Sequence, residues 1–558
     1  MNMKALIKIK LPDNVNKEVP IGTTIKDILD EKALSLDGDN YIIAAIVNGK
    51  AVELFTPIYA DSEIKPIRVL DRIGYAIYAR SLNYLAVIAA SQAFEKVKVR
   101  IEHSINNEIY GKLHIGRKLT EEDVDLLNKT MHSIVEEDLP IEKVKVLKTV
   151  AESIFKSYRM IDKTSLLKYA KEEYVSLYKC GNVYDYLYGP LVPSMGYLKS
   201  FDVNLFDNGF LIRLPEKKEI SKISSFRDIP KLRAAFEETN EWSHILKLAN
   251  VGDINNVLDG DINNRRDMFL VAEGLHEKKI SKIADKILEN IDNTKLILIA
   301  GPSSSGKTTF ANRLAIQLRV LGLDPKSISA DDYFYDREDT PINENGEYDF
   351  ESLRALDVNL LNTHLSQLLA KKEIDLIKFN FLKGEREFTG QKYKMNDKSV
   401  LIVEGIHGLN EEMTPSIPKE NKYKIYVSAL TNINLDNHSS IYVSDIRTLR
   451  RMIRDNSHRG MEPSETLLAW PSVRAGEEQN IFPYQEEADV IFNSTLVYEI
   501  HVLKKYAEPL LKKIPQDHPA YVEARRILKF LRFFKSADDE FIPQNSIMRE
   551  FIGGTCFE

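Results

Sequence analysis

The sequence predicts a multidomain α/β protein whose largest unit is a mostly parallel sheet flanked by helices. At 558 residues the chain is too long for one hydrophobic core, and its length corresponds to roughly three to four domains. Residues 291–504 alternate short apolar strands with helical patterns, which is typical of a parallel sheet with helices on both faces. Within this segment a glycine-rich turn joins an apolar strand to a helix, as in a phosphate-binding loop.

The first unit, residues 1–70, has a β-rich pattern. A strand is predicted over 4–11 and a helix opened by Thr23 and Thr24, and residues 42–47 form an apolar strand that ends in Asn48 and Gly49. This dipeptide favours a tight hairpin turn.

Three further units follow from changes in the pattern. Residues 71–215 mix strands with helices, including a long acidic helix from Thr120, and predict a compact α+β domain. Residues 216–290 are charged and mostly helical, so we expect a helical linker there. For the tail, 505–558, we expect helices with a loose end.

Composition excludes several classes of protein. Lys and Arg total 76 against 83 Asp and Glu, and the net charge of −7 gives no global reason to expect nucleic-acid or membrane binding. Only Cys180 and Cys556 occur, which argues against a disulfide framework and for a reducing compartment. No apolar run approaches the ~20 residues that span a bilayer, and the start lacks the apolar core of a signal peptide. We therefore expect a soluble cytoplasmic protein.

A complete G-x-x-x-x-G-K-[ST] phosphate loop follows the strand at 295–300. Backbone N–H groups of such a loop surround phosphates, Lys307 can reach the β and γ oxygens, and the Thr308 hydroxyl can hold Mg²⁺. The expected nucleotide-binding residues are Gly301, Pro302, Ser303, Ser304, Ser305, Gly306, Lys307, Thr308 and Thr309. A plain turn between a strand and a helix is the alternative. The sequence thus predicts binding of a nucleoside triphosphate.

Two acidic residues stand at the ends of later strands. The strand at 326–330 leads into Asp331 and Asp332, and a carboxylate there can accept the proton of an attacking hydroxyl. Asp331 is the candidate base; the alternative is a helix cap or turn residue, a role that suits Asp332 better. The strand at 399–403 delivers Glu404, which resembles a Walker-B carboxylate that serves Mg²⁺. An ordinary solvated Glu remains the alternative.

An arginine-rich helix follows near residue 450. Its arginines, with those of the following loop, can close over transferring phosphates, and Arg450 and Arg454 are the candidates for this role. The alternative is an amphipathic helix with solvated arginines.

In this order, the phosphate loop, the Asp331 segment, the Glu404 segment and the arginine-rich helix resemble the uridine kinase and phosphoribulokinase family of phosphate-loop kinases. The resemblance implies that Asp331 is the base, that Glu404 and Thr308 serve Mg²⁺, that lid arginines contact phosphates, and that ATP and Mg²⁺ are the cofactors. Gly384 stands where uridine kinases place a base-binding His. The expected acceptor-side residues are Asp349, Phe379, Phe381 and Arg386, although the Asp also fits a surface loop and the two Phe also fit a core.

The N-terminal half resembles two domains of threonyl-tRNA synthetases. Residues 1–70 are similar to the β-grasp TGS domain, and residues 71–215 are similar to the second additional domain, which edits mischarged tRNA. Its His pair and its Cys-x-Gly-Pro-His segment are replaced here, at the positions Arg80, Tyr84, Leu187 and Leu191. Leucines neither ligate a metal nor carry a proton, so we expect no editing activity.

The fusion resembles uridine kinase-like nucleoside kinases with a synthetase-like N-terminus. This implies a phosphotransferase that acts on a sugar hydroxyl of a small-molecule acceptor, a uridine- or cytidine-like nucleoside. A phosphoribulokinase-like sugar-phosphate kinase is one alternative. An RNA- or tRNA-linked regulatory NTPase is another, which rests on the resemblance of the N-terminal half alone.

Overall fold

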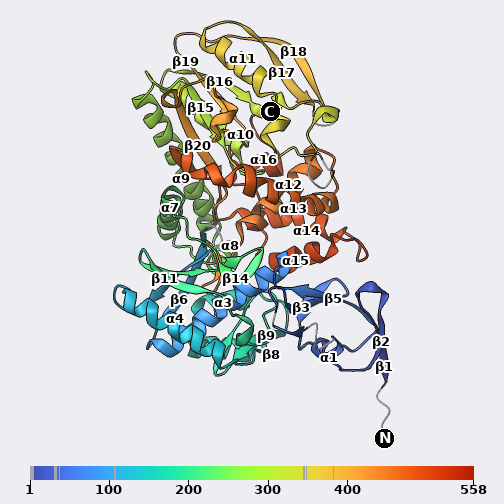
Figure 1. Ribbon diagram of the computed structural model, residues 1–558. Coiled ribbons are helices and arrows are strands. Elements are labelled where there is room, and N and C mark those ends of the chain that lie inside the picture. The colour runs from blue at the N-terminus through green and yellow to red at the C-terminus, as the bar shows by residue number, and fades with distance from the viewer. Residues whose placement is uncertain are drawn as a thin grey trace.

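The computed structural model describes residues 5–29, 34–36, 38–105, 108–342, 346, 348–380, 383–431 and 433–557. The N-terminal sheet and the α+β unit that follows it lie at one end of the molecule, and the parallel sheet lies at the other (Figure 1). Helices from the C-terminal part of the chain, drawn in orange and red, lie between the two ends (Figure 1).

A five-stranded sheet of order β2-β1-β5-β3-β4 begins the chain. Asn48 and Gly49 have φ angles of 47° and 75°, so the predicted hairpin turn between β3 and β4 is confirmed. The Thr24 hydroxyl accepts a hydrogen bond from the Asp27 amide and begins the predicted helix. The elements are β1 (Leu6–Lys10), β2 (Asn16–Pro20), α1 (Ile25–Ile28), β3 (Ile42–Val47), β4 (Lys50–Glu53) and β5 (Ser62–Arg68).

The next unit combines helices with two antiparallel sheets, of order β11-β12-β7-β6 and β10-β9-β8. Its longest helix, α3, is apolar over most of its length and runs through the core. The elements are α3 (Arg72–Ala93), β6 (Lys98–Ile105), β7 (Glu108–His114), α4 (Glu121–Glu136), β8 (Glu142–Leu147), α5 (Lys148–Ser157), α6 (Ile161–Lys168), β9 (Tyr174–Cys180), β10 (Val183–Asp185), β11 (Asp202–Phe206) and β12 (Gly209–Arg213).

The segment expected to be a linker is instead part of a core. Phe269 stacks on Tyr498 with ring centroids 4.0 Å apart, and Ile283 and Ile287 are buried in the core that also holds α10 residues. These helices are amphipathic, with charged residues on their outer faces and apolar residues packed inward. Their high overall charge led to the prediction of a linker. The elements are β13 (Pro215–Glu216), β14 (Glu219–Ile223), α7 (Pro230–Leu246), α8 (Val251–Asp259) and α9 (Ile262–Glu289).

A five-stranded parallel sheet of order β16-β19-β15-β20-β23 forms the other end of the molecule, as the sequence predicts. Side chains of the central strand alternate between two cores, with Ile297 and Ile299 on the α10 side and Leu296 and Leu298 on the α11 side. The strands are β15 (Leu296–Ala300), β16 (Asp324–Ser329), β19 (Ser399–Glu404), β20 (Lys422–Ser428) and β23 (Val490–Asn493). The helices are α10 (Lys307–Val320) and α11 (Val358–Leu369), and an antiparallel hairpin adds β17 (Ile374–Asn380) and β18 (Glu385–Tyr393).

The C-terminal helices pack beneath this sheet, and the expected loose end is wrong. Ile547, Met548 and Phe551 have no exposed surface and join the core around α10. In this C-terminal segment the apolar residues stand in short runs separated by Pro and Ser, so their spacing did not predict a helix. The helices are α12 (Val443–His458), α13 (Pro463–Asn480), α14 (Glu499–Lys512), α15 (Tyr521–Leu531) and α16 (Arg549–Ile552).

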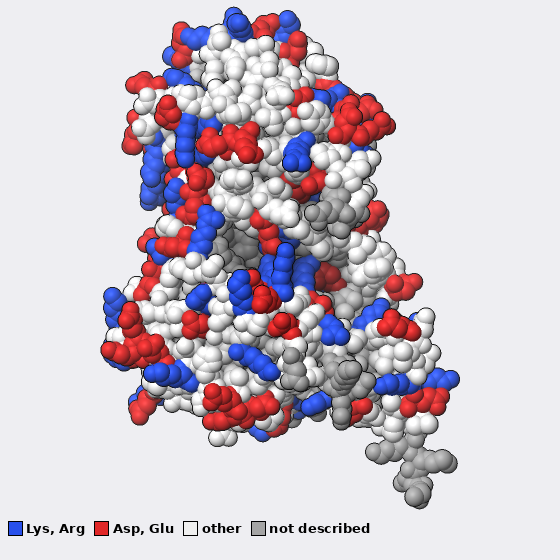
Figure 2. All heavy atoms as spheres, in the orientation of Figure 1, with Lys and Arg blue, Asp and Glu red and all other residues white. Residues whose placement is uncertain are grey.

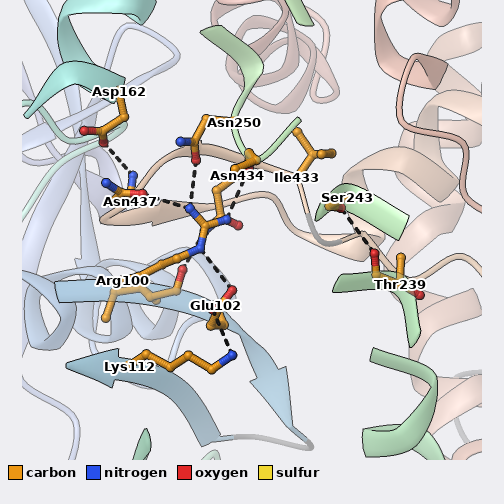
Figure 3. A network of polar contacts seen from close by, with 12 residues as sticks. Arg100, Glu102, Lys112, Asp162, Thr239, Ser243, Asn250, Ile433, Asn434 and Asn437 are labelled. Carbon is orange, nitrogen blue, oxygen red and sulfur yellow. Dashed lines mark hydrogen bonds and ion pairs between the residues drawn. The ribbon is translucent and has the colours of Figure 1, made fainter. Parts of the chain in front are cut away.

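A small hairpin before α12 contacts the α+β unit that contains β6, through a network of polar contacts (Figure 3). It consists of β21 (Asn434–Asp436) and β22 (Ser439–Ser440). The Ile101 amide of β6 donates to the Asn437 carbonyl at 2.8 Å, and Arg100 donates to the Asn437 and Asn250 side chains at 2.8 and 3.1 Å (Figure 3). We call the α+β unit that contains β6 the synthetase-like unit. It contacts the residues immediately before the arginine-rich helix α12.

The surface shows no large area of one charge on the face drawn in Figure 2, where Lys and Arg are interspersed with Asp and Glu. In the part of the chain that the structure describes, no helix is long and apolar enough to cross a membrane.

Candidate active site

The phosphate loop connects the buried strand β15 to α10. Gly301 lies against β20, and a Cβ there would come within 2.0 Å of the Val427 carbonyl oxygen. Gly306 has a φ of 85°, and a Cβ there would lie 2.6 Å from the Ile547 side chain. Both positions therefore require glycine, as the motif predicts.

A buried ion pair between Arg447 and Glu477 holds the phosphate loop through the backbone of Ser303. The Ser303 amide donates to Glu477 at 3.2 Å, and Arg447 donates to the Ser303 carbonyl at 3.0 Å. Arg447 and Glu477 pair with each other, at 2.9 Å for one of their hydrogen bonds, and both are almost completely buried. Sequence reasoning missed Glu477, because no local pattern links residues 174 positions apart.

Arg450 does not lie where the sequence analysis expects it. Its side chain is completely buried and forms two hydrogen bonds with Glu499, one of them 2.7 Å long. It also donates to the Ser304 carbonyl at 3.2 Å. Its position three residues after Arg447 places it on the inner face of α12, so it supports the loop from the core side instead of closing over phosphates.

The remaining arginines gather at Asp455. Arg451, Arg454 and Arg459 each lie within 3.6 Å of this buried carboxylate. Arg451 also donates to the Ser303 hydroxyl at 2.9 Å. Burial lowers the pKa of Arg459 to about 10, with a further contribution from the charge of Arg454. Three guanidinium groups share one carboxylate, so this cluster beside the loop keeps a net positive charge.

Glu404 ends β19 beside the phosphate loop. Its carboxylate accepts hydrogen bonds from the Thr308 hydroxyl at 3.3 Å and from the Ser329 hydroxyl at 3.0 Å. Burial raises the pKa of Glu404 to about 7, and the negative charge of Asp331 adds to the effect while Lys307 opposes it. Glu404, Thr308, Ser329, Asp331 and Lys307 therefore lie together at the carboxyl ends of β15, β16 and β19.

The two aspartates after β16 have different surroundings. They lie in a short 3₁₀ helix, Ala330–Tyr333. Asp332 accepts a hydrogen bond from the Phe379 amide at 3.1 Å, and burial raises its pKa to about 6. Asp332 thus ties this turn to β17. Asp331 is the carboxylate whose charge acts on Glu404.

Glu351 is a further acid at the site that sequence reasoning passed over. Burial raises its pKa to about 7, the charge of Glu477 acts in the same direction, and Arg451 and Lys307 act against it. It lies two residues after Asp349, an expected acceptor-side residue, and this position was the available signal.

Two of the residues expected on the acceptor side, Phe379 and Arg386, lie opposite each other in the β17–β18 hairpin. Phe379 is buried, and its ring centroid lies 5.8 Å from that of Phe334. Phe379 therefore occupies a core position, which is the alternative that the sequence analysis gave for it. Arg386 pairs with Asp357 at 3.0 Å. The Asp349 amide donates to the Pro341 carbonyl at 2.7 Å within a surface loop, and Phe381 lies outside the described residues. Gly384 has a φ of 76° and packs against the Arg337 side chain.

The oxygen atoms beside the loop suit a hard cation. The Thr308 hydroxyl and the Glu404 carboxylate are in contact, and the charge of Asp331 acts on the same carboxylate. Among the described residues no three His, Cys, Asp or Glu side chains form a metal cluster. An ion such as Mg²⁺ bound here would therefore need phosphate or water oxygens to complete its shell.

Comparison with known proteins agrees with this geometry, since a family model described as "Phosphoribulokinase / Uridine kinase family" matches the segment that forms the parallel sheet. The match covers residues 296–500. A solved structure described as a possible uridine kinase from Bacillus stearothermophilus is 19% identical with a TM-score of 0.28, covering 39% of this chain and 98% of that one.

The N-terminal half matches threonine–tRNA ligases. The enzyme of Thermotoga petrophila is 32% identical over 198 residues, which are 35% of this chain and 30% of that protein. Threonine–tRNA ligase 1 of Bacillus subtilis is 32% identical over 200 residues, 36% of this chain and 31% of that protein. The matched region thus spans under a third of these relatives.

The positions compared with the editing residues are packed in the structure. Tyr84 is buried and donates to the Val183 carbonyl at 2.8 Å, and Leu191 is buried. Arg80 donates to the Pro190 carbonyl at 2.8 Å and lies so close to Gly189 that a Cβ there would be 2.7 Å from its guanidinium. An Arg side chain thus fills the space beside the Gly-Pro segment.

Proposed function

We propose that this protein is an ATP-dependent small-molecule kinase that phosphorylates a sugar hydroxyl of a nucleoside. The observation that carries the proposal is the convergence of Thr308 and Glu404 at 3.3 Å, with Lys307 and Asp331 close enough to act on the Glu404 charge. A phosphate loop, a cation, two carboxylates and a positive cluster are the parts that phosphoryl transfer requires.

Each residue has a separate task in this mechanism. The loop amides and Lys307 hold the β- and γ-phosphates, and Mg²⁺ bound through Thr308 and Glu404 would supply charge neutralisation. Asp331 accepts the proton of the acceptor hydroxyl as its oxygen forms a bond to the γ-phosphorus. The bond between that phosphorus and the β–γ bridging oxygen breaks, and ADP leaves. Arg451, Arg454 and Arg459 lie where they can stabilise charge on the transferring group.

Two substrate classes are considered for the acceptor. The His that contacts the base in uridine kinases is absent, and the Arg337 side chain packs beside Gly384 at that place. A nucleoside with an unusual base contact fits this site, and a sugar phosphate held by the arginine cluster is the competing substrate class.

A panel assay tests the proposal. ADP release is measured with Mg-ATP against nucleosides and sugar phosphates, and the Lys307→Ala variant serves as the blank. We expect release above the blank with a nucleoside. ADP release with sugar phosphates alone would show that the acceptor is a sugar phosphate and not a nucleoside. Absence of ADP release with every acceptor would contradict the kinase proposal.

A tRNA-linked NTPase is a second candidate function, favoured by one observation. The synthetase-like unit holds the β21–β22 hairpin, and this hairpin leads directly into α12, which supports the phosphate loop. The N-terminal half therefore contacts, through this hairpin and α12, the loop that would bind the nucleotide. Stimulation of ATP consumption by tRNA, without an acceptor, would favour this reading over the kinase.

A further inference from the structure

The start of α10 is capped by a residue from the far end of the chain. Its N-cap is Gly306, which has no side chain to satisfy the first amides of the helix. The Thr309 amide and hydroxyl instead donate to Glu550, at 3.3 and 2.7 Å. Glu550 lies 241 positions away in α16.

The segment that delivers this carboxylate is firmly seated. We call residues 546–551 the C-terminal clasp. Ile547 packs against Gly306, and the guanidinium of Arg450 lies over the Phe551 ring at 4.9 Å. Ser546 donates to the buried Glu273 of α9. The clasp therefore contacts both the phosphate loop and the arginine that supports it from behind.

The position of Glu550 conflicts with phosphate binding. The first amides of a helix that follows a phosphate loop are the groups that receive phosphate oxygens, and the helix dipole favours an anion there. Glu550 already places an anion on the Thr309 amide and hydroxyl. Its charge also reaches Glu404 and contributes to the raised pKa of that carboxyl. A nucleotide entering the site adds several negative charges beside it.

We propose that Glu550 is an internal competitor of the nucleotide, an autoinhibitory contact in which the clasp holds a carboxylate on the phosphate-binding end of α10. Nucleotide phosphates displace this carboxylate and loosen the clasp. The proposal rests on the nucleotide-binding half of the proposed function and requires neither an acceptor nor turnover.

Calorimetric titration of the full-length protein with Mg-ADP tests the competition. Glu550→Gln keeps the shape of the side chain and removes its charge, so we expect a dissociation constant about tenfold lower than that of the wild type. Asp538→Asn is the matched control, since it removes one charge from the same part of the chain, where Asp538 is exposed and pairs with Lys505. An unchanged or higher dissociation constant in Glu550→Gln would overturn the proposal, as would failure of both proteins to bind.

A second measurement uses the wild-type chain and so does not depend on how the variant folds. Cys556 is exposed and Cys180 is buried, so a spin label attaches at the C-terminal side of the clasp. We expect saturating Mg-ADP to increase the mobile component of the spectrum. An unchanged spectrum would overturn the displacement. Both readouts concern binding alone, so a protein that binds Mg-ADP and phosphorylates nothing refutes the kinase proposal without deciding this one.

Discussion

The Thr308 hydroxyl donates to the Glu404 carboxylate across 3.3 Å and joins the phosphate loop to the end of the neighbouring strand β19. The two residues are 96 positions apart, and the parallel arrangement of β15 and β19 brings them together. This contact defines the edge of the sheet at which the chemistry is proposed.

Replacing Asp331 tests the proposed base. Asp331→Asn should lower turnover about a hundredfold or more while Mg-ATP still binds, because only proton acceptance is lost. Asp332→Asn is the control, because an amide oxygen can still accept the hydrogen bond from Phe379. Steady-state kinetics and calorimetry would report both. Normal turnover in Asp331→Asn would remove Asp331 from this role.

Glu404→Gln should raise the Mg²⁺ concentration needed for half-maximal activity by about tenfold or more, since a neutral amide is a poorer ligand than a carboxylate. Glu412→Gln, at an exposed position in the short 3₁₀ helix Glu411–Met413, is the control. Activity measured over a Mg²⁺ titration decides the matter, and superimposable curves for wild type and Glu404→Gln would exclude a metal role.

Arg450 and Arg454 should respond differently to removal. Arg450→Ala leaves Glu499 buried and unpaired, which is expected to cost about 3–5 kcal/mol of unfolding free energy. Arg454→Ala should unfold near the wild-type midpoint and lose activity instead, because Arg454 is partly exposed and Asp455 keeps two other arginine partners. Chemical denaturation and kinetics on both variants distinguish structural support from phosphate contact. The reverse pattern would contradict the geometry.

Glu108 predicts a pH dependence of stability. Burial raises the pKa of this carboxyl to about 7, whereas in the unfolded chain it titrates near its ordinary value. The folded state therefore binds more protons between these pKa values, so this group makes stability fall as the pH rises through that window. Glu108→Gln should add about 1–2 kcal/mol at pH 8 and little at pH 4. Equal effects at both pH values would refute the assignment.

The contact between the two halves of the molecule predicts a local effect on exchange. Arg100→Ala removes donors to Asn250 and Asn437, so amide hydrogen exchange should become faster in β21, β22 and the first turn of α12. Arg117→Ala is the control, because Arg117 pairs with Asp123 inside the synthetase-like unit. If the amide hydrogen exchange rates of β21 and β22 are the same in both variants, Arg100 does not stabilise the hairpin or the start of α12.

The sequence predicted those parts of the site that local patterns encode. The phosphate loop, Glu404 and Asp331 each follow an apolar strand, and parallel strands end at a common edge, so their proximity could be expected. Glu477 and Glu550 could not be expected, because each reaches the loop from a helix that is remote in sequence and carries no motif. Arg450 was assigned to the wrong face of α12, since five arginines in one helix and its loop conceal which of them face inward.

The same reasoning explains the fold. Short strands with a clear turn, such as the hairpin at Asn48 and Gly49, were predictable from residue type. Helices α7 to α9 were taken for a linker because charge dominates their composition, and the packing of α9 against α10 depends on partners elsewhere in the chain.

The central claim is transfer of the γ-phosphoryl group to an alcohol, and the most direct test follows that group itself. The full-length protein and the Lys307→Ala variant are incubated with γ-labelled Mg-ATP and a mixture of nucleosides, and the labelled products are separated. The account predicts a labelled phosphate monoester of a nucleoside, formed by the wild type and not by the variant. Label recovered only as inorganic phosphate, or only in ATP, would contradict it.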